Sequence, residues 1–412
     1  MNEKLRVMET FAGIGAQHKA IKNACDDYFR VEKICEWDAR AIISYANIHY
    51  NFIVDNILLA NNIHTEKDIN NFLSKKIFSL NSKKPSRLVS KNINFKKMLI
   101  ASTIITNNHP NILNLKGKDI ENIDLLTYSF PCQGLSIANM GRAKGIKKDV
   151  DSTSNLIWQI ERVLSEAKNN KQKLPKYLLL ENVTQLISKS HIDDYEEWKK
   201  ILLSMGYKTF TYVLNSEDFG MVQKRKRLFA ISINDSKISW TQEKIQNIID
   251  SFKSKLNEEQ RKDWISNNIQ IKPHPSQYHE YILATPNKTP SRLRMAIENK
   301  TIDSNLISWL NTLTTKQDRH PNIGMIDFEH NDSKKLNKRF VTPREAYKIM
   351  GFQDNDFDKL KNMWISDKNK FLTTESLYRQ AGNSIAVKVL EAIFKTIKQI
   401  DIEENKYEKN IK

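Results

Sequence analysis

The sequence predicts an α/β fold in which a mostly parallel sheet is joined to a smaller, irregular domain. Short apolar runs alternate with helical patterns over the first 235 residues, and a glycine turn separates the first run from its helix. This alternation is lost from about residue 235 to 340. Because 412 residues are many for one compact domain, we expect a main domain over 1–235, a smaller one over 236–371, and a segment over 372–412 that returns to the main domain.

The composition indicates a polyanionic partner. Lys and Arg number 65 against 48 Asp and Glu, which gives a formal net charge of +17. Such a surplus favours nucleic acid or an anionic membrane surface. The three cysteines include no C-x-x-C pair, and the sequence contains neither a secretory signal nor an apolar run of about 18 residues. We therefore expect a cytoplasmic protein with no disulfide framework, metal site or membrane segment.

The first elements are those of the nucleotide-binding half of an α/β sheet. Residues 4–15 are typical of a buried strand that ends in a glycine turn, 16–27 of a helix, and 31–37 of a strand that ends on an acidic residue. Residues from about 60 to 118 are polar and rich in Lys and Asn. We interpret them as an insertion that carries helices and a basic surface, although a solvated face is the simpler interpretation of such charges.

Regular alternation returns after this insertion. We expect strands at 123–130, 177–183, 208–214 and 228–233, and helices at 155–168 and 194–205. From about residue 235 to 340 the alternation of strands and helices is lost, and the sequence is rich in Pro, Asn and basic residues. A second glycine turn leads into an amphipathic helix over 381–397.

The glycine turn Phe11-Ala12-Gly13-Ile14-Gly15 lies where the first strand meets its helix. Small residues there allow a ligand to approach the backbone, and the start of the helix offers free N–H groups. A G-x-G turn alone is weak evidence, since many such turns are only structural. Glu36, at the end of the second strand, suits hydrogen bonds to ribose hydroxyls, and Trp37 suits stacking on a purine.

The sharper pattern is Pro131-Cys132-Gln133 at the end of a predicted strand. A lone cysteine is usually a small buried hydrophobe. Here, however, Glu181 ends the next strand, and the arginines of Gln223-Lys224-Arg225-Lys226-Arg227 precede another strand and alternate toward one face. A cysteine, a carboxyl group and arginines beside a nucleotide pocket indicate nucleophilic attack on a polarised heterocycle.

Together the motifs resemble those of the DNA cytosine-5 methyltransferases of bacterial restriction–modification systems, in family order over nearly the whole chain. The resemblance rests on Phe11 to Gly15, Glu36-Trp37, Lys118-Asp119-Ile120, Pro131-Cys132-Gln133, Glu181-Asn182-Val183, Gln223 to Arg227, Thr342-Pro343-Arg344-Glu345 and Gly382-Asn383-Ser384. It implies a Rossmann-like S-adenosylmethionine-dependent methyltransferase sheet and a target-recognition domain in residues 236–371.

The resemblance also assigns roles to single residues. The expected contacts to S-adenosylmethionine are Phe11, Ala12, Gly13, Ile14, Gly15, Glu36, Trp37, Asp119, Ile120, Pro131, Leu156, Asn383 and Ser384. The expected catalytic residues are Cys132, Glu181, Arg225 and Arg227. Asp119 is expected at the adenine amino group.

The implied chemistry starts from cytosine C5, which is a poor nucleophile. Addition of the Cys132 thiolate to C6 would place electron density on C5, with Glu181 at N3 and Arg227 at O2 of the base. Arg225 would support the cysteine or a phosphate. Since C6 is covered inside a duplex, the cytosine must be flipped out.

Two segments are expected to contact DNA. Residues 134–154 resemble the family's mobile catalytic loop, in which Ser136, Arg142 and Lys144 are the expected contacts. Many relatives carry an arginine near Thr153, and its absence here suggests that Arg142 or Lys144 takes over its phosphate contact. In the recognition domain, Thr312-Leu313-Thr314 resembles a motif that meets the DNA backbone. The expected contacts there are Thr314, Lys316, Gln317 and Arg319. Arg and Gln can bind guanine and adenine edges, but phosphate contact alone is the simpler role.

Two alternatives stay open. One is an RNA cytosine-5 methyltransferase on the same fold, although RNA-acting relatives are usually compact and this chain has a large recognition region. The other is a non-catalytic DNA-binding protein, against which Cys132, Glu181 and Arg227 argue. The expected partner is double-stranded DNA, the expected state is a monomer, and a cognate restriction endonuclease is possible. The sequence does not identify the target site.

Overall fold

The structure is a computed structural model that describes residues 3–132, 134–135, 145–146, 153–269, 274–303, 309–366 and 370–411. It divides into two compact units. Unit 1 consists of Met1–Leu214, Lys226–Phe252 and Leu390–Lys412, and unit 2 of Asn215–Arg225 and Lys253–Val389. These boundaries differ from the expected 236–371, because the helix α8 (Gln242–Ser251) belongs to unit 1 whereas the segment before residue 226 belongs to unit 2.

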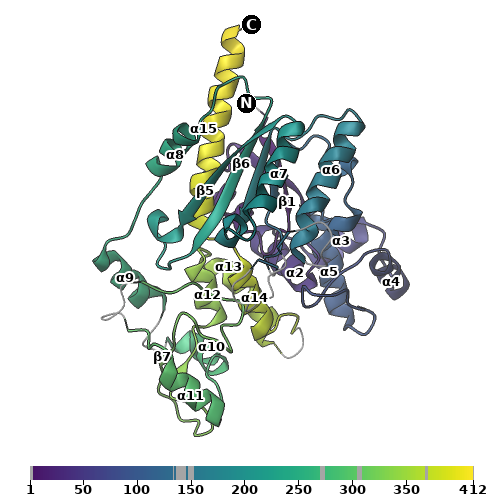
Figure 1. Cartoon of the computed structure of the whole chain (residues 1–412). Helices are drawn as coiled ribbons and strands as arrows, with labels where there is room; N and C mark the ends of the chain where they lie inside the picture. Colours follow the sequence, from purple (N-terminus) through teal and green to yellow (C-terminus); the bar gives the residue numbers. More distant parts are fainter. Residues whose placement is uncertain are drawn as a thin grey trace. The chain divides into compact units, whose positions relative to one another are not determined.

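Within its described residues, unit 1 is built on a six-stranded sheet with the strand order β2-β1-β3-β4-β6-β5 (Figure 1). The strands are β1 (Leu5–Thr10), β2 (Phe29–Cys35), β3 (Leu125–Tyr128), β4 (Tyr177–Asn182), β5 (Tyr207–Asn215) and β6 (Lys226–Asn234). The first four run parallel, and β6 pairs antiparallel with β4. The predicted strands are thus confirmed, and the carboxyl ends of β1, β2, β3 and β4 lie at one edge of the sheet.

Helices cover both faces of this sheet. On one face α6 (Ile157–Asn169) and α7 (Ile192–Ser204) pack on alternate residues of β3 and β4 in one continuous apolar core. The helix α15 (Val387–Ile411) lies on the other face and runs alongside the sheet in Figure 1. Its Asp401 accepts hydrogen bonds from Tyr28, Lys176 and Tyr177 at 2.7 to 2.8 Å. These contacts join the last helix to unit 1, whereas the preceding residues, up to Val389, belong to unit 2.

The insertion between β2 and β3 is helical, as expected. It follows α2 (Ala39–His49) and contains α3 (Val54–Ala60), α4 (Glu66–Ser74) and α5 (Ile93–Ile105). Local capping sets the helix starts: Thr65 and Asp68 form a capping box on α4, and the Asn92 side chain accepts two backbone N–H groups of α5. The apolar α5 packs against α2, α3 and α4, which makes the insertion part of unit 1.

Unit 2 is more helical than the sequence indicated. Its helices are α9 (Glu258–Asn268), α10 (Tyr278–Leu283), α11 (Pro290–Glu298), α12 (Pro343–Ile349), α13 (Asp354–Ile365) and α14 (Thr374–Asn383). Short strands β7 (Ile326–Asp327) and β8 (Lys338–Arg339) pair antiparallel. The buried ion pairs Arg339–Glu345 and Arg344–Glu280 connect these elements.

The glycine turn predicted before the last helix is wrong. Gly382 lies inside the last turn of α14, where a Cβ atom would come within 2.5 Å of the backbone of Thr314 and Thr315. The glycine is therefore required for close packing and not for a turn. None of the described helices combines the length and the apolar character needed to cross a membrane.

Candidate active site

The turn after β1 forms a loop whose backbone is open to a ligand. Gly13 has φ +56°, and a Cβ atom there would meet no atom within 4 Å in the described part of the chain. Its N–H donates to Oε2 of Glu36 at 2.8 Å, which ties the loop to the end of β2. Phe11, also at positive φ, donates its N–H to the carbonyl of Cys35 at 2.7 Å. An open glycine backbone beside a carboxylate fits a nucleoside-containing ligand.

Gly15 has a different role. With φ +78° it precedes α1 (Ala16–Ala24), and a Cβ atom there would come within 2.4 Å of His49 Nε2 and 2.6 Å of a ring carbon of Tyr45. His49 Nε2 also lies 3.0 Å from the carbonyl oxygen of Ile14, and the ring of His49 stacks on that of His18 at 4.4 Å. The absence of a side chain at Gly15 therefore allows His49 and Tyr45 of α2 to pack directly against the glycine loop.

Glu36 is held rigidly at the carboxyl end of β2. Its Oε1 accepts the N–H groups of Trp37 and Asp38 at 2.8 and 2.7 Å. The Asn108 side chain accepts the N–H of Glu36 and donates to its carbonyl, both at 3.0 Å. Burial raises the pKa of Glu36 to about 7, against the opposing effect of these N–H donors. The chain thus presents a positioned, partly buried carboxylate, and Trp37 beside it is also half-buried.

The third predicted cofactor motif lies in the short 3-10 helix Gly117–Ile120. Asp119 is half-buried, and its Oδ2 accepts the N–H of Lys116 at 2.8 Å. The charges of Asp119 and Glu36 both act on the Cys35 thiol, whose pKa is raised mainly by burial. The contact of Asp119 with S-adenosylmethionine stays a prediction. Ile120 is fully buried in the apolar core, and its contact with the donor also stays a prediction.

Cys132 lies on a turn that is fixed by two polar side chains. The Oγ of Ser154 donates to the carbonyl of Pro131 at 2.8 Å and accepts the N–H of Gly134 at 3.0 Å. The Nδ2 of Asn182 donates to the carbonyl of Phe130 at 3.0 Å. Cys132 itself is half-buried and, like Phe11 and Leu156, packs against the edge of the core. Gln133 lies outside the described residues.

Glu181 and Arg227 meet beside this turn. Tyr128 of β3 pairs in register with Leu180 of β4, so the residues that follow them leave adjacent strands at the same edge. The Nε of Arg227 lies 3.6 Å from Oε1 of Glu181, with both side chains largely buried. Because neighbouring strands are about 4.8 Å apart, this pair and the turn that carries Cys132 lie at the same edge of the sheet.

The backbone of unit 2 holds the guanidinium of Arg225. It is buried in unit 2, where Nη1 donates to the carbonyl of Leu313 at 3.1 Å and Nη2 to those of Gly382 and Ser384 at 2.9 Å. These contacts give Arg225 a structural role in unit 2, and its catalytic role stays a prediction. Asn383 and Ser384 also belong to unit 2 and stay predictions for the donor site.

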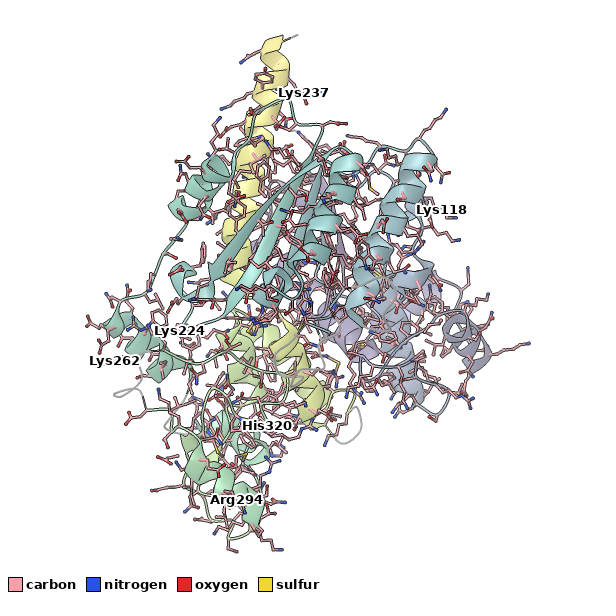
Figure 2. The ribbon with its side chains drawn as sticks, viewed as in Figure 1. Lys118, Lys224, Lys237, Lys262, Arg294 and His320 are labelled. Carbon is pink, nitrogen blue, oxygen red and sulfur yellow. The ribbon has the colours of Figure 1, made fainter. Side chains whose placement is uncertain are left out.

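Some of the expected DNA contacts lie outside the described residues, and the others belong to unit 2. Ser136, Arg142 and Lys144 lie outside the described residues. In unit 2, Lys316 is exposed, Thr314 is half-buried, and Arg319 pairs with Glu375 at 2.9 Å. Gln317 is fully buried, and its contact with a base edge stays a prediction. Basic side chains project outward from both units, as Lys118 and Arg294 illustrate in Figure 2.

Sequence reasoning missed the residues that position the site. Ser154, Asn182 and Asn108 hold the turns of Cys132 and Glu36 through backbone hydrogen bonds. His49 supports the glycine loop from a helix that lies more than 30 residues later in the chain. Asn182 and Ser154 stand inside segments that the sequence analysis recognised, but the sequence gives no local signal for Asn108 or His49.

The residues at the carboxyl edge of the sheet in unit 1 suit two tasks. They can bind a nucleoside-containing ligand, and they offer groups for nucleophilic chemistry. Gly13 and Glu36 provide the binding half. Cys132, Glu181 and Arg227 provide a nucleophile, a carboxyl group and a cation. Adjacent donor and acceptor halves on one sheet edge are what group transfer requires.

Comparison with known proteins agrees with this chemistry. The sequence model of the family described as "C-5 cytosine-specific DNA methylase" matches residues 87–399. The chain is 32% identical to the "Orphan methyltransferase M.SssI" of Spiroplasma monobiae, over 96% of this chain and 97% of that protein. It is 30% identical to the "Type II methyltransferase M2.ScrFI" of Lactococcus lactis subsp. cremoris, over 95% of this chain and 99% of the relative.

Among solved structures, the S. pombe Dnmt2 methyltransferase shares the fold, with a TM-score of 0.61 and 20% identity over 95% of this chain and 98% of that one. The extent of these sequence matches, with the motifs in order, settles the family. The chain belongs to the C-5 cytosine-specific DNA methylases.

Proposed function

We propose that this methyltransferase transfers a methyl group from S-adenosylmethionine to C5 of a cytosine flipped out of double-stranded DNA, through a covalent bond between Cys132 and C6. The observation that carries the proposal is the Glu181–Arg227 pair, 3.6 Å apart at the same sheet edge as Cys132. The family description, "C-5 cytosine-specific DNA methylase", supports DNA as the substrate.

The residues of the donor half fit S-adenosylmethionine. The open backbone at Gly13 leaves room for the ligand, and Glu36 offers carboxylate oxygens to ribose hydroxyls. Trp37 would lie against the adenine, with Asp119 as the candidate partner of its amino group. The bound donor supplies an electrophilic methyl group on a sulfonium.

The acceptor half makes the cytosine ring reactive. The Cys132 thiolate adds to C6, which forms the S–C6 bond and moves an electron pair toward C5. A protonated Glu181 donates to N3, and the Arg227 guanidinium donates to O2, so both offset the charge that develops on the ring. After C5 is methylated, loss of the C5 proton to solvent restores the double bond and releases Cys132 as a thiolate.

Two further properties follow as proposals. The enzyme acts as a monomer in the cytoplasm, since modification of one flipped base needs no symmetric partner. It works with or without a cognate restriction endonuclease, because one relative is named an orphan methyltransferase and others are named type II enzymes.

The test is transfer of a labelled methyl group to plasmid DNA and, in a parallel reaction, to transfer RNA. The proposal predicts incorporation into DNA, at cytosines that bisulfite sequencing then identifies as one repeated sequence. Incorporation into transfer RNA alone would favour the RNA-modifying alternative. No incorporation into either, with the donor bound, would favour a non-catalytic DNA-binding protein.

A further inference from the structure

In one stretch of the insertion between β2 and β3, every charged residue is basic. Between residues 75 and 97 the chain contains no Asp or Glu and eight basic residues: Lys75, Lys76, Lys83, Lys84, Arg87, Lys91, Lys96 and Lys97. A run of lysines is most often a solvated face. Here, however, the centre of the run, residues 79–91, is held against the catalytic edge of the sheet, and we call it the basic loop.

The attachment of the basic loop to the edge is direct. The N–H of Ser79 donates to the carbonyl of Trp37 at 2.7 Å, and the N–H of Ala39 donates to the carbonyl of Ser79 at 2.8 Å. Arg40 Nη1 donates to the carbonyl of Leu80 at 2.8 Å. The loop is thus bound to residues 37–40, which directly follow Glu36 beyond the carboxyl end of β2.

The basic loop is also closed on itself. The Oγ of Ser79 donates to the carbonyl of Lys84 at 2.7 Å, and the N–H of Leu80 donates to Oγ of Ser86 at 3.0 Å. The N–H of Ser86 donates to the carbonyl of Phe78 at 2.8 Å. Phe78 and Leu88 are buried at its two ends. A loop ordered in this way loses little conformational entropy when it binds a partner.

Its cations are free to meet an anion. Lys83, Lys84 and Arg87 are exposed, and within the described residues none of them has a carboxylate within ion-pair distance. By contrast, Lys96 and Lys97 farther along pair with Glu66 and Asp55. The uncompensated charge is therefore concentrated in the loop that is fixed to the edge.

This edge is where the substrate must arrive. In the strand order, β1 alone separates β2 from β3, which leads to Cys132, so β2 and β3 lie about 10 Å apart across the sheet. One turn of duplex DNA spans about 34 Å. A duplex whose flipped base reaches Cys132 therefore passes within one turn of a surface next to β2.

We propose that the basic loop is an additional DNA-binding surface of unit 1, at which Lys83, Lys84 and Arg87 bind backbone phosphates of the duplex that flanks the target cytosine. The inference rests on the proposed function, since it requires double-stranded DNA as the substrate. The contacts carry no sequence information. They add affinity and hold the enzyme on long DNA between target sites.

The test compares two double variants that remove equal charge. Lys83→Gln/Lys84→Gln alters the basic loop. Lys171→Gln/Lys173→Gln alters two exposed lysines that precede β4, at the opposite edge of the sheet. The affinity of each for a 40-base-pair duplex is measured against salt concentration, and the KM and kcat for plasmid methylation are measured at one salt concentration.

The loss of two phosphate contacts makes the slope of log Kd against log salt shallower by about 2. We expect this change, with a raised KM for plasmid and an unchanged kcat, for the Lys83/Lys84 variant only. Lys83→Arg/Lys84→Arg should keep the wild-type slope. Equal slopes for the variant and the wild type would overturn the inference. So would a defect confined to transfer RNA or to vesicles containing phosphatidylserine, because either would identify another partner.

Failure of this inference can be told from failure of the proposed function. If the wild type methylates plasmid DNA but the slope does not depend on Lys83 and Lys84, only the surface is wrong. If the wild type neither binds nor methylates DNA, both proposals fall. Unchanged thermal unfolding and unchanged binding of S-adenosylhomocysteine show that each variant is folded.

Discussion

The backbone N–H of Gly13 donates to Oε2 of Glu36 at 2.8 Å, which joins the loop after β1 to the end of β2. The other oxygen of Glu36 is held by the N–H groups of Trp37 and Asp38. A single carboxylate thus organises the backbone of the donor half and offers its remaining acceptor positions to a ligand.

Glu36→Gln should weaken donor binding. A hydrogen bond to a charged group contributes about 1.5–3 kcal/mol, so the Kd for S-adenosylhomocysteine should rise about 10- to 100-fold in calorimetric titration. Glu32→Gln, which changes the same charge on the same strand, is the control and should bind normally. Equal affinity in the Glu36 variant would remove Glu36 from the donor site.

The Glu181–Arg227 pair should act on the chemical step. Replacing Glu181 by Gln removes a proton donor, which typically lowers a rate by about 10²- to 10⁴-fold. We expect such a loss in kcat for Glu181→Gln and for Arg227→Met, with the Kd for duplex DNA nearly unchanged. Lys226→Gln, an exposed neighbour of Arg227, should retain kcat. A loss that appears only in DNA binding would contradict the assigned roles.

Arg225 should instead be required for stability. Its guanidinium donates to the carbonyls of Leu313, Gly382 and Ser384, and a buried carbonyl without a partner costs about 1–3 kcal/mol. Arg225→Met should therefore lower the midpoint of thermal unfolding by several degrees, whereas Lys224→Met at an exposed position should not. A variant that unfolds like the wild type but has lost kcat would restore Arg225 to the catalytic machinery.

Glu9 should make the stability depend on pH. It is fully buried, and burial raises its pKa to about 8. Between its unfolded value of 4.5 and about 8, the folded state retains a proton that the unfolded state has lost. Folding stability therefore falls as the pH rises through this window, by at most about 1.4 kcal/mol per pH unit.

Glu9→Gln removes this proton. The unfolding midpoint of the variant should rise relative to that of the wild type as the pH increases from 6 to 8.5. Exposed Glu408→Gln should keep a constant difference from the wild type over the same range. A constant difference for the Glu9 variant as well would mean that the buried carboxyl has an ordinary pKa.

Much of unit 1 could be predicted because its signals are local. Apolar strands of four to nine residues alternate with amphipathic helices, and the motifs stand at strand ends, where an α/β sheet concentrates its chemistry. The positions of Cys132 and Glu181 follow from strand order alone.

What could not be predicted depends on contacts between distant segments. Arg225 and Arg227 alternate along the chain as expected, yet the chain passes from one unit to the other between them. Gln317 is of a residue type that can read bases but is fully buried in this structure. Gly382 has the sequence of a turn but lies in α14, because it packs on the backbone of Thr314. None of these contacts leaves a periodic trace in the sequence.

The central claim is a covalent bond between Cys132 and the base, and DNA that contains 5-fluorocytosine in place of cytosine tests it most directly. Fluorine at C5 cannot be lost as a proton, so the adduct stays intact after methyl transfer. With S-adenosylmethionine present, the wild type should form a protein–DNA complex that survives denaturing electrophoresis, and Cys132→Ser should form none. A wild-type enzyme that methylates ordinary plasmid DNA but never becomes linked to the fluorinated duplex would contradict the account.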